Sequence, residues 1–86
     1  MKNSVNEKND SVVALAQFVR ERRKANNLKQ VDLALLAGVG RRFVSELENS
    51  KSSLQMDKVN AILRVFGMQL GVIPRQKPDI ETGGDS

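Results

Sequence analysis

The chain has 86 residues, contains neither Cys nor His, and carries a formal charge of +4 at pH 7. This length suits one domain with a core of marginal size. The missing residue types exclude disulfides, thiolate metal sites and histidine-based catalysis. We therefore expect one domain that is not an enzyme and holds neither a cofactor nor a metal.

The basic charge is concentrated in the middle of the chain. Residues 11–77 carry twelve Lys or Arg against five Asp or Glu, whereas residues 78–86 carry three acids and no base. Such an excess attracts polyanions, and nucleic acid is the first candidate. A solvated basic surface without that partner is the alternative. No apolar run approaches the roughly 18 residues of a membrane span, so we expect a cytoplasmic protein without a membrane partner.

The first predicted helix covers residues 11–26. Its apolar residues recur at helical spacing and form one stripe, namely Val12, Leu15, Ala16, Phe18 and Val19. Asp10 or Ser11 is expected to cap its start. Asn26-Asn27 is expected to end it, because Asn tolerates the left-handed conformation that closes helices. Residues 1–10 are expected to form a flexible N-terminus.

Two short helices are predicted next, over residues 30–37 and 41–48, joined by Gly38-Val39-Gly40. Their inward side chains are expected to be Leu33, Ala34, Ala37, Val44 and Leu47. Gly38 supplies the positive φ that a sharp turn requires. Two short helices around a Gly-containing turn predict a helix-turn-helix, whose second helix can enter the DNA major groove.

A fourth helix is predicted over residues 55–66, because its apolar residues repeat at helical spacing and Gly67 stands at the expected end. Its buried stripe is Val59, Ile62, Leu63 and Phe66. Together, residues 11–67 are expected to form the DNA-binding domain. Residues 75–86 have few apolar groups and are expected to be a disordered tail.

Residues 68–74 predict a short strand that Pro74 ends. A lone strand cannot satisfy its own backbone, and the sequence offers no second one. We therefore expect it to pair with the same strand of a second copy across a twofold axis. Met68, Leu70 and Val72 would form the dimerisation face over the preceding helix. The alternative is an extension that packs only on its own domain.

The central stretch resembles the Cro/C1-type (XRE) helix-turn-helix family over about residues 12–67. The matching positions are Gln30, Leu33-Ala34, Gly38-Val39, Val44-Ser45 and Glu48-Asn49. The resemblance implies a lambda-repressor-like, all-α domain of four helices, here with one C-terminal β-strand that pairs across a dimer. Two positions depart from the pattern. Gly40 stands where many relatives have Ser, Thr or Asn, and Ser50 stands where the family usually has Gly, so we expect Asn49 to adopt the left-handed conformation instead.

Within that family the chain is most similar to HipB-type antitoxins. The similarity lies in residues 40–49, 56–59 and 66–70. It implies a homodimeric repressor of its own operon that binds a HipA-like kinase toxin. A stand-alone phage-type or metabolic repressor, and a helical protein-interaction adaptor that has lost DNA binding, are the alternatives. An RNA-binding module lacks the surface aromatics that stack unpaired bases.

The predicted DNA-contacting residues fall into two sets. Base contacts are expected from Arg41, Arg42 and Ser45, because Arg can bond guanine O6 and N7 together; which Arg does so is left open. Backbone contacts are expected from Gln30, Lys29, Gly40, Asn49, Lys51 and Ser52. A dimer on a palindromic operator would make each of these contacts twice, once in each half-site.

We expect three further side chains of the third predicted helix to make contacts within the domain rather than with bases. We expect Glu46 to pair with Arg42 rather than to read a cytosine. Glu48 is expected to pair with an Arg of the first helix, because a buried charge needs a partner. We expect Phe43 to be scaffold rather than a reader of thymine methyl groups.

Overall fold

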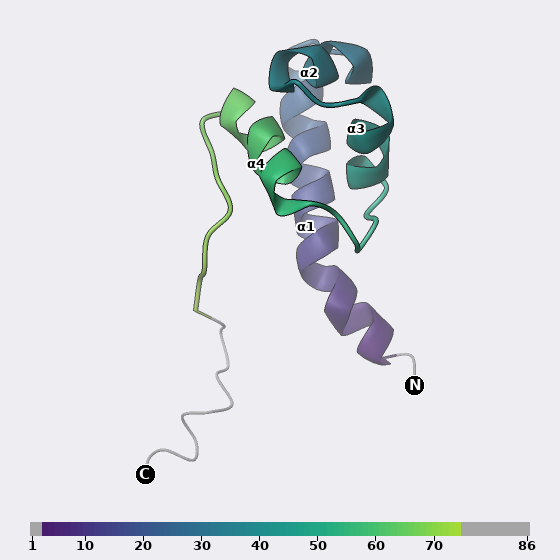
Figure 1. Ribbon diagram of the computed structural model, residues 1–86. Helices are drawn as coiled ribbons and strands as arrows, with labels where there is room; N and C mark the ends of the chain where they lie inside the picture. The colour runs from purple at the N-terminus through teal and green to yellow at the C-terminus, as the bar shows by residue number, and fades with distance from the viewer. Residues whose placement is uncertain (1–2, 75–86) are drawn as a thin grey trace.

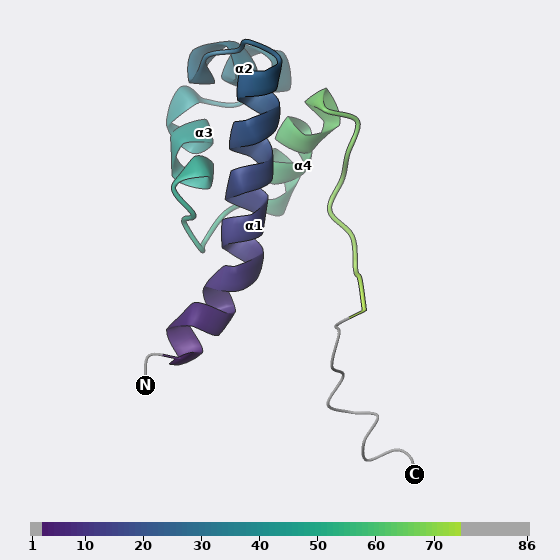
Figure 2. The same cartoon turned by 180° about the vertical axis from the view of Figure 1, so that it is seen from behind.

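The computed structural model describes the backbone of residues 3–74 and the side chains of residues 11–74. This part of the chain is all-helical, with helices at α1 Asn3–Ala25, α2 Gln30–Ala37, α3 Arg41–Glu48 and α4 Met56–Val65. The three shorter helices gather around the C-terminal half of α1, whose N-terminal half extends beyond them (Figures 1 and 2). None of these helices has the length and apolarity to cross a bilayer.

The short helices form as the sequence predicts, whereas α1 is longer. The bounds of α2 and α3 agree with prediction, and α4 is one residue shorter at each end. The expected start of α1 at Ser11, capped by Asp10 or Ser11, is wrong, because the helix begins at Asn3. Residues 3–10 are helical, and residues 1 and 2 lie outside the described residues. The flexibility of residues 1–10 stays a prediction. Extending an existing helix adds one hydrogen bond per residue fixed, so polar residues can continue it without an apolar stripe.

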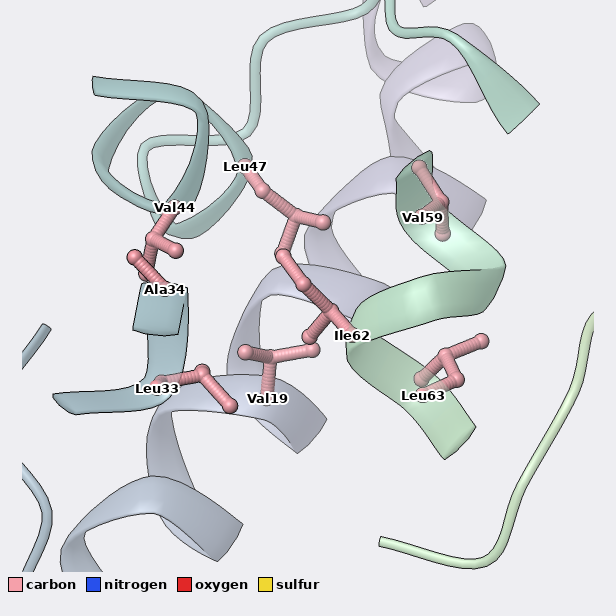
Figure 3. Packing of buried hydrophobic residues seen from close by; sticks show 8 residues of the cluster. All are labelled: Val19, Leu33, Ala34, Val44, Leu47, Val59, Ile62 and Leu63. Atoms are coloured by element: carbon pink, nitrogen blue, oxygen red, sulfur yellow. The ribbon is translucent and has the colours of Figure 1, made fainter. Parts of the chain in front are cut away.

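The core is built by one stripe from each helix. Its buried members are Val19 of α1, Leu33 and Ala34 of α2, Val44 and Leu47 of α3, and Val59, Ile62 and Leu63 of α4. Figure 3 shows the side chains of Val19, Leu33, Leu47 and Ile62 converging between the helices. All eight stand at positions that the apolar periodicity predicts to be inward. Phe18 and Phe66 close the edge of this core with their rings nearly perpendicular and 6.4 Å apart.

Within the described residues, a left-handed residue follows each of the four helices and redirects the chain. Asn27 has φ 57° after α1, and both Gly38 and Gly67 have φ 76° after α2 and α4, as predicted. After α3 the prediction is wrong: Asn49 has φ −94°, and Ser50 has φ 63°. Asn49 continues the hydrogen-bonding pattern of the helix, because its N–H donates to the Ser45 carbonyl at 3.0 Å. The sharp turn therefore falls on the next residue, Ser50.

Residues 68–74 run away from the end of α4 and form no strand ladder within the described residues (Figure 1). The Leu70 side chain packs against the core, and its N–H donates to Asn60 Oδ1 of α4 at 2.7 Å. Val72 is 102% exposed, so it does not lie over α4 in the single chain as expected. The predicted tail, 75–86, lies outside the described residues. Strand pairing between two copies stays a prediction.

Candidate nucleic-acid interface

The helix-turn-helix unit consists of α2, the turn Gly38-Val39-Gly40 and α3. The N–H groups of Gly38 and Val39 both donate to the Ala34 carbonyl, at 2.9 and 3.0 Å, which closes α2. Gly40 then begins α3 with an extended backbone at φ −79° and ψ 153°. Val39 packs against the core. Apolar packing therefore fixes the turn and, with it, the direction of α3.

The α3 helix separates an inward and an outward face. Val44, Leu47 and Glu48 are buried, whereas Arg41 and Arg42 in its first turn are exposed. Cations at a helix N-terminus oppose the macrodipole, because the unpaired N–H groups there carry partial positive charge. Two adjacent Arg side chains in that place are suited to an anion that docks from solvent.

Glu46 connects the outward face of α3 to the loop behind it. Its Oε2 lies 3.3 Å from Arg42 Nε, the predicted pair, and its Oε1 lies 3.4 Å from Lys51 Nζ. The Lys51 N–H also donates to the Glu46 carbonyl at 3.0 Å. The Ser45 side chain is half-buried, and its Oγ accepts from Asn49 Nδ2 at 3.4 Å. Four predicted DNA-contacting residues are thus tied to one edge of α3.

The buried carboxylate of Glu48 joins three helices. Arg23 of α1 donates to it twice, from Nε to Oε2 at 2.6 Å and from Nη2 to Oε1 at 2.9 Å. Gln30 Nε2, at the start of α2, donates to Oε1 at 3.2 Å. Arg20 Nη2 adds a bond at 2.7 Å to the Glu48 carbonyl, one of the carbonyls left free at the end of α3. The expected partner of Glu48 in the first helix is therefore confirmed, and it is Arg23.

This network determines the charge state of Glu48. Burial alone raises the pKa of its carboxyl, but hydrogen bonds from Arg23 and Gln30, with the positive charges of Arg23 and Arg20, outweigh burial and hold that pKa below its ordinary value. The bonds to Glu48 raise the pKa of Arg23 in turn. The pair is ionised at neutral pH.

The predicted backbone-contacting residues lie at the start of α2, in the turn before α3 and directly after α3. Lys29, Gly40, Asn49, Lys51 and Ser52 are all exposed, and Gln30 is half-buried. The Lys29 N–H donates to Asp32 Oδ2 at 2.8 Å, which satisfies one free donor at the start of α2. The bond between Gln30 and Glu48 brings the start of α2 next to the end of α3. The start of α2 and the end of α3, which carry Gln30 and Asn49, therefore lie side by side.

Two residues that the sequence did not single out also matter here. Lys58 of α4 lies over the half-buried ring of Phe43, with its Nζ 5.9 Å from the ring centroid. The ring packs against the core, as the scaffold prediction requires. Asn60 holds residues 68–74 to α4 through Leu70. An Asn inside a helix is a weak signal for such a bond, because Asn otherwise prefers caps and turns.

The predicted dimerisation residues lie along one side of the domain. Met68 is 42% exposed, Val72 is fully exposed and Leu70 is half-buried. Met68 and Leu70 line an apolar groove of about 430 Å³, whose other walls come from α1 and α4 and include Leu15, Phe18 and Leu63. An open apolar groove beside an extended segment is a surface that a second copy can cover.

The comparison with protein families matches the Helix-turn-helix model to residues 19–73, which contain α2, α3 and α4 entirely. The chain belongs to the helix-turn-helix family. An uncharacterized HTH-type transcriptional regulator, y4mF, from Sinorhizobium fredii is 39% identical over 59 residues, which cover 69% of this chain and 78% of the relative. No solved structure matches the chain.

Proposed function

We propose that this member of the helix-turn-helix family is a sequence-specific DNA-binding transcriptional repressor, with α3 as its recognition helix. The observation that carries the proposal is the pair Arg41 and Arg42, exposed in the first turn of a helix whose opposite face is locked in the core. A rigid helix with exposed Arg in its first turn has the geometry that reads base edges in the major groove. The HTH-type transcriptional regulator among its relatives supports a role in transcriptional regulation.

The proposed contacts divide by chemistry. Arg41, Arg42 and Ser45 lie on the outward side of α3 and are assigned to base edges. The remaining set is assigned to the DNA backbone, namely Gln30, Lys29, Gly40, Asn49, Lys51 and Ser52. Lys29 and Gln30 stand at the start of α2 and Gly40 at the start of α3, where free N–H groups can bond phosphate oxygens. Asn49, Lys51 and Ser52 follow α3, and their side chains are assigned to phosphate oxygens. Ser45 bonds Asn49, so a contact by either residue affects both.

The repressor is proposed to act as a homodimer on a palindromic operator. The supporting features are the exposed Val72, the apolar groove behind Met68 and Leu70, and the use of the Leu70 N–H by Asn60. Successive N–H groups of an extended chain point to opposite sides. With Leu70 donating toward α4, the N–H of Gly71 points to the side where a second strand can pair.

A finer proposal is that the protein is a HipB-type antitoxin in the cytoplasm, which represses its own operon and binds a HipA-like kinase. Its support is the resemblance of residues 40–49, 56–59 and 66–70. Co-purification with the product of the adjoining reading frame tests it. A neighbouring frame that encodes no kinase would leave a stand-alone repressor.

One observation favours a second candidate function, a protein-interaction adaptor. Leu35 is 77% exposed and Leu36 is 62% exposed, side by side on α2. Adjacent exposed leucines are suited to a protein partner rather than to DNA. The two functions differ in whether duplex DNA binds at all.

The deciding experiment is a gel-shift titration with the duplex upstream of the gene and with a scrambled duplex of equal length. We expect preferred binding to the upstream duplex, and an affinity that falls steeply with salt because phosphate-bound counterions are released. The double variant Arg41→Ala, Arg42→Ala should retain the fold, because both side chains are exposed, and lose the preference. Equal binding to both duplexes by the unaltered protein would refute the repressor function.

A further inference from the structure

The exposed triad of Arg42, Glu46 and Lys51 has a geometry that goes beyond a surface ion pair. Each oxygen of the Glu46 carboxylate faces a different cation, Oε2 toward Arg42 and Oε1 toward Lys51. Glu46 keeps 30% exposure, whereas Arg42 keeps 91%. The carboxylate is thus partly enclosed at the base of the triad, and the Arg42 head extends into solvent.

The nitrogen through which Glu46 binds Arg42 determines which N–H donors of the guanidinium remain free to contact DNA. Glu46 engages Nε, at 3.3 Å. A guanidinium has five N–H donors in a planar fork, and Nε carries one of them. The four N–H donors on Nη1 and Nη2 therefore remain available. One of them, on Nη2, lies parallel to Nε–H on the edge that Glu46 holds, and the other three, including the two parallel donors at the end of the guanidinium, point away from that edge. Two parallel donors at the end of an Arg match O6 and N7 of guanine.

Arg41 lacks this support within the described part of the chain. Its side chain is exposed, and none of the hydrogen bonds or ion pairs among residues 11–74 involves it. A free Arg side chain loses more rotamer freedom on binding than one that is already oriented. The two neighbouring Arg residues are therefore not equivalent.

From this asymmetry we infer that Glu46 is a specificity-determining positioning residue, which holds Arg42 by Nε so that Nη1 and Nη2 read a guanine. The inference rests on the proposed DNA-binding function. It makes Arg42 rather than Arg41 the guanine reader. Lys51, held by the other carboxylate oxygen, balances the charge that Glu46 brings close to DNA and remains directed to a flanking phosphate.

The expected size of the effect on guanine preference distinguishes the positioning role of Glu46 from a role in stabilising the fold. An exposed pair four residues apart on a helix changes the folding equilibrium only about twofold. In a protein–DNA interface the same pair is partly removed from water, which strengthens it. We therefore expect removal of the Glu46 carboxylate to lower the guanine preference about two- to tenfold, the worth of one hydrogen bond, while loss of Arg42 lowers it about 5- to 150-fold.

The experiment is selection from a random duplex pool, with base preference measured at every position of the bound site. The proteins are the unaltered chain, Arg42→Ala, Glu46→Ala and Glu46→Gln. Glu46→Gln removes the same charge as Glu46→Ala but retains an oxygen that can accept from Arg42 Nε. The charge control is Glu21→Gln, which neutralises an exposed acid on α1.

We expect Arg42→Ala to remove a guanine preference at one base pair per half-site. Glu46→Ala should weaken the preference at that same base pair, Glu46→Gln should retain more of it, and Glu21→Gln should leave it unchanged. In the Arg42→Ala background, Glu46→Ala should have no further effect at that base pair.

Three results would overturn the inference and leave the proposed function intact. One is an Arg42-dependent guanine preference that Glu46→Ala does not alter. Another is a change at a different base pair, which would make Glu46 itself a reader of cytosine N4. The third is an equal effect of Glu46→Ala and Glu21→Gln. Selection of no sequence by the unaltered protein would refute the proposed function and the inference together.

Discussion

The buried ion pair between Arg23 and Glu48 predicts a large dependence of stability on one carboxylate. The side chains are only 12% and 4% exposed. Removing one partner of a buried pair costs about 3–5 kcal/mol, because the other charge remains without compensation. Arg23 retains some solvent and its Nη1 bond to the Leu28 carbonyl at 2.9 Å. For Glu48→Ala we therefore expect the lower end of that range, about 3 kcal/mol.

The loss is large against the total stability of such a domain, about 4–13 kcal/mol at this length. It is measured by thermal unfolding followed with far-ultraviolet circular dichroism, since the chain has no Trp or Tyr for a fluorescence signal. For a domain of this size 1 kcal/mol shifts the midpoint by about 4–8 °C, so the expected fall is about 12–24 °C. Glu21→Ala, which removes an exposed acid from α1, is the matched control and should change the midpoint by less than about 4 °C.

The same carboxylate makes stability depend on pH in a defined direction. The folded pKa of Glu48 lies below its ordinary value of 4.5, because the bonds and charges of Arg23, Gln30 and Arg20 outweigh the effect of burial. The folded state therefore binds fewer protons than the unfolded state, and the stabilisation is fully present above about pH 4.5. It is lost as the pH falls through the lowered pKa. Glu48→Gln should lack this contribution to the acid transition.

Two results would refute this reasoning. A midpoint shift no larger than that of the Glu21→Ala control would mean that the pair does not stabilise the fold. An unchanged acid transition in Glu48→Gln would assign the pH dependence to other carboxylates. A compensating double variant, Arg23→Met with Glu48→Leu, should regain much of the lost stability, because an apolar pair of similar volume leaves no buried charge.

Three further predictions follow from single contacts. Gln30→Ala should weaken binding to the upstream and the scrambled duplex alike in gel shifts, because a phosphate contact carries no sequence information. Ser50→Gly should raise the free energy of unfolding by about 0.5–1 kcal/mol in thermal melts, because φ 63° strains a residue with a side chain; the matched Ser52→Gly should not. Gly71→Pro should sediment as a monomer, because Pro cannot donate to a strand ladder, whereas Gly71→Ala, whose Cβ meets nothing within 4 Å, should remain a dimer; a dimeric Gly71→Pro would place the interface elsewhere.

The bounds of α2 and α3 could be predicted from sequence because short-range chemistry decides them. Gly38 and Gly40 bracket the turn, and the apolar residues repeat at helical spacing on either side of it. The start of α1 could not be placed in this way. Residues 3–10 lack an apolar stripe, and polar residues can extend a helix that is already formed.

In the candidate site, several residues close together in the sequence could make the same contact, and the sequence alone does not show which of them does. Periodicity indicates that Glu48 needs an Arg from α1, but α1 contains Arg20, Arg22 and Arg23. Only the packing of α1 against α3 selects Arg23 for the carboxylate and directs Arg20 to the Glu48 carbonyl. In the same way, the hydrogen bonds at the end of α3 decide that Ser50, one residue after Asn49, turns left-handed.

Because an α-helix has about 3.6 residues per turn, the residues of α3 that stabilise the fold and those proposed to read DNA lie on different faces of the helix. Glu46 and Glu48 are two residues apart, so they lie on different sides of the helix. Glu48 faces α1 and holds Gln30, so its loss should lower stability and DNA-backbone binding together. Glu46 faces solvent beside Arg42 and Lys51, so its loss should alter base preference and leave the thermal midpoint nearly unchanged. The two carboxylates of one short helix therefore offer a direct test of whether the outward face of α3 is the part that reads DNA.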